Sequence, residues 1–275
     1  MEASDHCAAI LRRRDHDRYV ADLYAPEPAR GHLFALHAFG TEVARVRDVV
    51  SEPTLGEIRL TWWRDALAGS DGGGHPIARE LLPTIDAFRL PRAAFEMLID
   101  ARVFDLYDDP MPTLVDLEGY AGQTASAMLQ LTATILAPKG APAYSEAAGH
   151  GGVAEALTRI MAALPLHSAR GQCYLPADLM AAHGVDRATL HAGRGTPELT
   201  SLLAELRAIA RHHLAKSERA IADLPREVKA AFLPLATVAP YLDAMDRARY
   251  DPFSGRSPVA PWRRQWTIWR AARRS

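Results

Sequence analysis

Apolar residues recur at intervals of three and four along this 275-residue chain, and this spacing constrains its fold more than any other feature. The pattern is typical of helices that bury one face. It is clearest at Leu33, Leu36, Phe39, Val43 and Val46, and again at Leu199, Leu202, Leu206 and Ile209. No alternating pattern of useful length predicts a β-strand. The sequence therefore predicts an all-α fold.

Prolines divide the helical pattern into segments. Because proline lacks a backbone N–H and fixes its own φ, it favours helix ends and connectors. Breaks are predicted at Pro26, Pro53, Pro91, the pair Pro110 and Pro112, the stretch 138–142, and Pro225. Short connectors between antiparallel helices would account for them. A chain of this length with 48% hydrophobic residues can bury a sizeable core, and we expect residues 1–275 to form one domain.

The overall charge limits the expected classes of binding partner, and the cysteines indicate the redox environment. The net charge of −1 gives no reason to expect a nucleic acid as partner. The two cysteines, Cys7 and Cys173, lie far apart without metal-ligand spacing, so we expect neither a disulfide framework nor a zinc site. A reducing compartment is the simplest interpretation.

The N-terminus and the most apolar run bear on localisation. The first residues carry acids and then Arg12, Arg13 and Arg14, without the apolar region of a secretory signal peptide. The run 125–138 falls short of the roughly 20 apolar residues that a transmembrane helix needs. We expect a cytoplasmic protein without a signal peptide or transmembrane segment, with a peripheral position at the inner membrane as the alternative.

The stretch 34–48, together with Leu60-Thr61-Trp62-Trp63-Arg64, resembles the first signature region of the squalene/phytoene synthase family. In active members an acidic cluster of the form Asp-Asp-x-x-Asp holds metal ions there. In this chain Ala44 and Arg45 replace the first two aspartates, and only Asp48 remains. One carboxylate cannot supply the oxygen shell that Mg²⁺ prefers, and nearby arginines would repel the ion.

The stretch 156–176 resembles the second acidic region of the same family. Tyr174-Leu175-Pro176 matches the end of the family pattern. Arg159 stands in place of an asparagine, Ala163 and His167 in place of aspartates, and Leu166 in place of a glutamate. Both metal-binding clusters are therefore degraded, and the resemblance implies no catalytic residue, no metal ligand and no cofactor.

The resemblance is greatest to the non-catalytic branch of the family, the mitochondrial complex I assembly factors and their bacterial relatives. Residues 34–39, 49–59, 174–178 and 183–185 carry it. It implies a helical bundle of the isoprenoid synthase type around a central cavity. It also implies an assembly or chaperone-like factor for respiratory complex I, with complex I subunits or assembly intermediates as partners.

Two other functions remain open at this stage. One is a prenyltransferase that joins two prenyl diphosphates head to head with the help of Mg²⁺. The other is an isoprenoid or lipid binding protein that has kept the cavity without the chemistry.

The resemblance also places a set of residues around a remnant substrate pocket. They are Tyr19, Asp48, Arg159, His167, Arg170 and Tyr174. Arginine suits phosphate because its planar guanidinium presents a fork of donors. Each residue also has a plain structural interpretation: Asp48 would pair with Arg45 or Arg47, and Arg170 and Tyr174 would pack beneath the turn before Leu175.

Three further acids stand close together before Pro110. Asp105, Asp108 and Asp109 could suggest a displaced metal motif, but carboxylates beside a helix breaker usually face water. We therefore expect these acids to lie at an exposed helix end.

The C-terminal segment 261–275 is basic and rich in tryptophan. Trp262, Trp266 and Trp269 are spaced to share one helical face, and arginines surround that face. This composition is typical of a helix that lies on an anionic lipid surface or docks on a partner. The alternative is a last helix that packs on the protein and has a solvated basic edge.

Overall fold

A computed structural model describes residues 3–70 and 74–274, and every regular element in these ranges is helical. The prediction of an all-α fold is confirmed. The first part of the chain forms α1 (Ala3–Arg14), α2 (His16–Asp22), α3 (Glu27–Ala44), the 3₁₀ segment η1 (Val46–Val49), α4 (Pro53–Leu67), α5 (Pro76–Phe88), α6 (Arg92–Val103) and the 3₁₀ segment η2 (Phe104–Leu106). None of the described helices is long and apolar enough to cross a membrane.

The middle and last parts of the chain complete the bundle. The middle forms α7 (Leu114–Ala121), the π-helical segment η3 (Gly122–Ser126), α8 (Ala127–Leu136), the 3₁₀ segment η4 (Pro138–Tyr144) and α9 (Ser145–Ala162). The last part forms α10 (Leu164–Ala169), α11 (Ala177–His183), α12 (Arg187–His191), α13 (Pro197–Ala222), α14 (Arg226–Lys229), the 3₁₀ segment η5 (Ala230–Thr237), α15 (Val238–Met245) and α16 (Pro261–Ala272).

Prolines begin several of these helices, as the sequence predicts. Pro26, Pro91 and Pro225 immediately precede α3, α6 and α14, and Pro53 is the first residue of α4. Proline is tolerated there because the first N–H groups of a helix have no partner within the helix. The residue pattern thus fixes where the chain may change direction.

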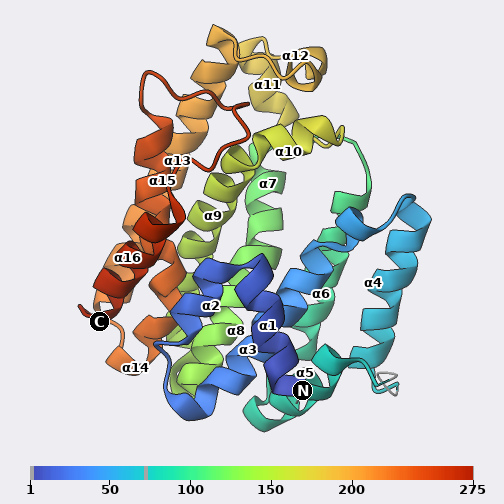
Figure 1. Ribbon diagram of the computed structural model, residues 1–275, viewed down its shortest axis with the longest axis vertical. Helices are drawn as coiled ribbons and strands as arrows, with labels where there is room; N and C mark the ends of the chain where they lie inside the picture. The colour runs from blue at the N-terminus through green and yellow to red at the C-terminus, as the bar shows by residue number, and fades with distance from the viewer. Residues whose placement is uncertain (1–2, 71–73, 275) are drawn as a thin grey trace.

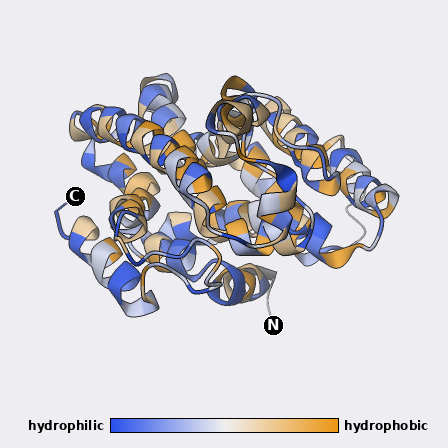
Figure 2. Cartoon of the chain, turned by 90° about the horizontal axis from the view of Figure 1, so that it is seen from above, coloured by the Kyte–Doolittle hydropathy of each residue, from blue (hydrophilic) through white to orange (hydrophobic). Residues whose placement is uncertain are grey.

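The helices bury two hydrophobic clusters that meet at α8. One is built mainly from the first 106 residues and includes the apolar face of α3, and the other runs from Met111 to Met245 and includes that of α13. Met128 and Leu131 of α8 belong to the first cluster, and Leu129 belongs to the second. Figure 1 shows α7, α8 and α9 between the early and late helices, and Figure 2 shows hydrophobic and hydrophilic residues sharing the same helices. One domain over residues 1–275 stays a prediction.

Helix α9 lies at the centre of the second cluster because its small residues let other elements approach closely. At Gly151 a Cβ would collide with side chains of Leu235 and Ser217. At Gly152 it would collide with the backbone of Ser126 in η3. Gly149, in the same helix, has open space around the corresponding position. The contact between α9 and η3 therefore depends on glycine at position 152.

This contact yields a test of the packing. We expect Gly152→Ala to destabilise the fold by about 2 kcal/mol or more, and to lower Tm by about 4 °C or more. The added Cβ would collide with backbone atoms of Ser126, which cannot rotate away as the end of a flexible side chain can. Gly149→Ala is the matched control. It should leave Tm unchanged or raise it slightly, because alanine favours the helix by up to about 1 kcal/mol over glycine. Equal Tm values for the two variants would contradict the close packing.

Candidate functional site

The two stretches that resemble the family's acidic regions meet at one cavity of about 400 Å³. Ala44 and Asp48 line it from the end of α3 and from η1. Ala163, Leu166 and His167 line it from the turn between α9 and α10 and from α10 itself. Positions far apart in the sequence, which resemble metal-binding positions of the family, therefore surround the same space. Arg45 does not line the cavity.

Local backbone changes aim these residues inward. Helix α3 ends at Ala44, and the 3₁₀ turn of η1 then carries Asp48. Helix α9 ends at Ala162, and Pro165 lies in the first turn of α10. Because proline cannot continue the hydrogen bonding of α9, the chain turns there and presents His167 to the cavity.

Asp48 is already engaged by arginines. Its carboxylate accepts a hydrogen bond from Arg170 and lies 3.7 Å from the guanidinium of Arg45. The expected pairing with Arg45 is thus present. Arg47 instead lies 3.7 Å from Asp108. The one acid that survives from the first region is therefore paired with two positive charges.

Asp105 corrects the expectation that the acids before Pro110 all face water. Its side chain is buried and accepts hydrogen bonds from the hydroxyls of Tyr120 (2.8 Å) and Tyr174 (2.7 Å). Arg102 donates to its other oxygen at 3.1 Å. Burial and the nearby carboxylate raise the pKa of Tyr174, so this phenol keeps its proton and remains a donor. Asp105 is buried because a shell of donors satisfies it.

His167 lies against Tyr174, with ring centroids 4.5 Å apart. Burial and the positive charge of Arg170 lower the pKa of His167 to about 4, although Asp48 acts in the opposite direction. The imidazole is therefore neutral near pH 7. Its Nδ1 is buried without a hydrogen-bond partner in the structure.

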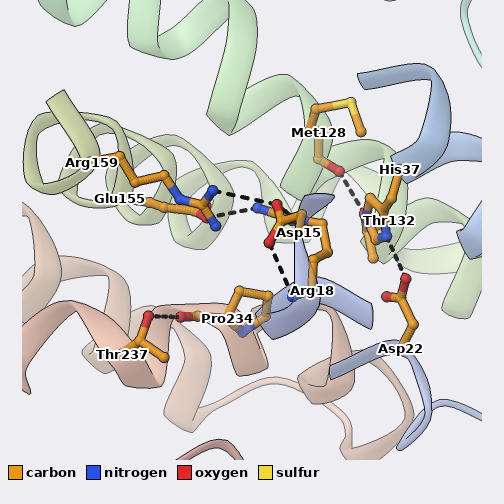
Figure 3. Close-up of polar contacts among 10 residues, drawn as sticks. All are labelled: Asp15, Arg18, Asp22, His37, Met128, Thr132, Glu155, Arg159, Pro234 and Thr237. Carbon is orange, nitrogen blue, oxygen red and sulfur yellow. Dashed lines mark hydrogen bonds and ion pairs between the residues drawn. The ribbon is translucent and has the colours of Figure 1, made fainter. Parts of the chain in front are cut away.

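A larger cavity of about 890 Å³ adjoins the first and shares Arg159, Ala163 and Leu166 with it. Asp15, Glu155 and Arg159 line it and form an ion network with Arg18, which is drawn in Figure 3. Glu155 accepts a hydrogen bond from Arg18 at 2.7 Å and lies 2.9 Å from Arg159. Arg159 also reaches Asp15 at 3.3 Å. The Arg159 that replaces the family's asparagine is thus held between two carboxylates.

The structure brings five of the six predicted pocket residues to the smaller cavity and leaves one elsewhere. Asp48, Arg159, His167, Arg170 and Tyr174 all line it. Tyr19 lines neither cavity. Its ring stacks on Phe34 with centroids 5.6 Å apart, because α2 directs this side chain toward α3. The preceding residue, Arg18, enters the ion network instead.

Sequence reasoning did not identify Arg18 and Glu155 as residues of the site, and it expected Asp105 to be exposed. Arg18, Asp105 and Glu155 are buried and hold the paired residues in place. One signal was available for Glu155, since it stands four residues before Arg159, the spacing of an ion pair on one helical face. No local signal pointed to Arg18, whose partner is 137 residues away.

The chemistry of the smaller cavity suits anions better than divalent cations. Arg47, Arg102, Arg159 and Arg170 line it, against two acids, Asp48 and Asp105. Buried nitrogen atoms of Arg47, Arg102 and His167 lack a hydrogen-bond partner in the structure. In the described part of the chain, no group of three or more histidine, cysteine or acidic side chains could hold a metal ion.

The buried network yields a prediction about stability. We expect Glu155→Gln to destabilise the fold by about 3 kcal/mol or more, because it removes the carboxylate closest to Arg18 and leaves Arg18 and Arg159 to share Asp15 alone. Glu146→Gln is the matched control, since Glu146 is exposed on the same helix and should change stability by only a few tenths of a kcal/mol, roughly the effect of a surface charge. Urea unfolding at neutral pH would measure both.

The same network predicts a pH dependence. Burial alone would raise the pKa of Glu155 and of Asp15, but Arg18 and Arg159 reverse this and leave both pKa values lowered. A lowered pKa in the folded state adds stability above the unfolded pKa, and this stability is lost as the pH falls below about 4. In urea unfolding from about pH 6 to 3, the wild type should therefore lose more stability than Glu155→Gln. Parallel curves for the two proteins would contradict this account.

Comparison with known proteins agrees with this geometry. A model of the squalene/phytoene synthase family matches residues 11–270. The rat protein named NADH dehydrogenase (ubiquinone) complex I, assembly factor 6 is 32% identical over 251 residues, which cover 90% of this chain and 75% of the rat protein. The human protein of the same name is 30% identical and is covered to 76%. A phytoene synthase of Thermus thermophilus is 28% identical over 265 residues, covering 93% of this chain and 87% of that enzyme.

Solved structures show the same fold. A dehydrosqualene synthase in complex with ligand superposes with a TM-score of 0.83 at 19% identity, covering 99% of this chain and 96% of that one. A squalene synthase from Alicyclobacillus acidocaldarius gives a TM-score of 0.75 at 22% identity, covering 91% and 95%. The predicted isoprenoid synthase fold is confirmed. On the strength of the family match across nearly its whole length, the chain belongs to the squalene/phytoene synthase family.

Proposed function

We propose that this chain is a non-catalytic family member that assists the assembly of respiratory complex I, with complex I subunits or assembly intermediates as its partners. One observation carries the proposal: the two regions that would supply metal-binding carboxylates meet at one cavity, where they offer a single carboxylate, Asp48, beside alanine, leucine and imidazole side chains. The relatives named as complex I assembly factor 6, at 30–32% identity, support the same role. A cytoplasmic location, peripheral at the inner membrane, would suit this role.

The residues present do not fit the Mg²⁺ cluster that the family implies. Mg²⁺ prefers an octahedral shell of oxygen atoms and is usually held by carboxylates together with phosphate. At the smaller cavity the two carboxylates, Asp48 and Asp105, already bind arginine or tyrosine side chains. Binding a divalent ion would require breaking these contacts beside two further positive charges, Arg47 and Arg159. We therefore propose no metal, no cofactor and no catalytic residue.

A second candidate function, metal-independent binding of an isoprenoid or other anionic lipid, has its own support. The adjoining cavities together are large enough for a chain-like molecule, at about 890 and 400 Å³. The unpartnered nitrogen atoms of Arg47 and Arg102 could donate to a phosphate group. The apolar side chains of Ala162, Val238 and Leu166 line the larger cavity.

A genetic experiment tests the assembly role. Deletion of the gene in its own organism should lower NADH:quinone oxidoreductase activity of the membranes and leave succinate oxidation unchanged. The wild-type gene should restore the activity. Asp48→Asn should restore it equally, because the proposal gives this carboxylate no metal to hold. Normal complex I activity in the deletion strain would refute the proposal, and failure of a well-folded Asp48→Asn protein would favour metal chemistry.

A binding experiment separates the remaining candidates. We expect Mg²⁺ to add nothing to the Tm of the protein in the presence of farnesyl or geranylgeranyl diphosphate, and we expect no diphosphate release. A shift that needs Mg²⁺ and is accompanied by product would establish the prenyltransferase, since a ligand bound only to the native state raises Tm by mass action. A shift without Mg²⁺ that Arg102→Met weakens would support lipid binding.

A further inference from the structure

The C-terminal helix α16 is fixed to the protein along one face. Ile268 is fully buried and packs with Ala21 of α2 and Leu233 of η5. Arg264 lies 2.8 Å from a carboxylate oxygen of Asp17 and donates to the hydroxyl of Tyr241 at 3.0 Å. These contacts hold the helix on the protein, as the interpretation of 261–275 as a packed last helix requires.

The opposite face leaves large aromatic side chains in solvent. Trp262 is 64% exposed and Trp266 is 54% exposed. Trp266 stacks on Trp269, with ring centroids 4.6 Å apart. A core function cannot account for Trp262 and Trp266, since most of their surface contacts nothing in the protein. Exposed tryptophan is common where one side of a ring meets apolar groups and the other meets water.

The charge around these rings has one sign. Arg263, Arg270, Arg273 and Arg274 are exposed, and the segment 261–274 contains no acidic residue. Arg263 lies over the ring of Trp262 at 5.2 Å, and Arg273 lies over the ring of Trp269 at 5.1 Å. The aromatic rings and the guanidinium groups thus form one continuous surface on a chain whose net charge is −1.

We propose that α16 is an interfacial helix that docks the protein on a bilayer rich in anionic phospholipid. Trp262 and Trp266 enter the headgroup region, and the arginines beside them bind lipid phosphates. Charge complementarity selects this occupant: the surface combines aromatic and cationic groups, and a bilayer with anionic headgroups satisfies both kinds at once. Because Ile268 and Arg264 already fix the helix, little order is lost on docking. The inference does not depend on the assembly role.

The inner side of α16 faces the larger cavity. Arg264 and the neighbouring loop residues Arg256, Ser257 and Pro258 line the larger cavity. A bilayer seated against the outer face of α16 would therefore lie within one helix diameter of the cavity wall, roughly 10 Å.

Vesicle flotation tests the proposal with the full chain. The protein should float with phosphatidylcholine vesicles that contain phosphatidylglycerol, less so as salt is raised, and should remain in solution with phosphatidylcholine alone. The double variant Arg270→Gln and Arg273→Gln should weaken vesicle binding about thirtyfold. The double variant Trp262→Ser and Trp266→Ser should weaken it by about tenfold or more. Both should keep the wild-type Tm, since the changed side chains are mostly exposed.

Matched variants on the distant helices α4, α5 and α7 complete the experiment. Ile58→Ser with Val115→Ser removes two apolar side chains that are 61% and 75% exposed, and Arg59→Gln with Arg79→Gln removes two exposed charges. These variants should bind vesicles as the wild type does. The proposal is overturned if the wild type does not float with anionic vesicles, if it floats equally with neutral ones, or if the α16 variants bind no more weakly than their controls.

Discussion

The buried ion pair between Arg18 and Glu155 joins the first helices to the central one, and much of the structure depends on it. Glu155 is 3% exposed on α9, where an unpaired carboxylate would be costly. Arg18 neutralises it from α2, at 2.7 Å. The position of α2 then decides two other contacts, the stacking of Tyr19 on Phe34 and the packing of Ala21 against α16. The pair thus links the N-terminal helices, the cavity wall and the C-terminal helix.

Local sequence predicted the elements of this fold well because the relevant forces act locally. The apolar spacing of α3 and α13 reports which face is buried, and proline reports where a helix can begin. Not every proline marks a helix end: Pro83 lies inside α5, and the helix continues past it. The topology could not be derived from periodicity, because many bundles share the same pattern of amphipathic helices. It came from the family resemblance, which the superposed synthases then confirmed.

The site was predicted less completely for a physical reason. The resemblance located positions such as Asp48 and His167, since these belong to contiguous motifs. It could not locate their partners, because burial of Asp105 depends on Tyr120 and Tyr174 arriving from two other segments. The same limit applies to α2, where Tyr19 lines neither cavity and its neighbour Arg18 pairs with Glu155. Partners that are distant in sequence become visible only when the chain is folded.

Ion pairs within the chain balance the charges at the two cavities. Clustered carboxylates repel one another unless a cation lies between them. A metal site is therefore electrostatically stable only when its metal ion is bound. Here each acid at the cavities lies beside an arginine of the same chain, as Asp48 lies beside Arg170 and Glu155 beside Arg18. The charges are balanced internally, so the cavity walls are organised before any ligand arrives. Such a scaffold can present its outer surfaces, α16 among them, in one fixed arrangement whether or not its cavity is filled.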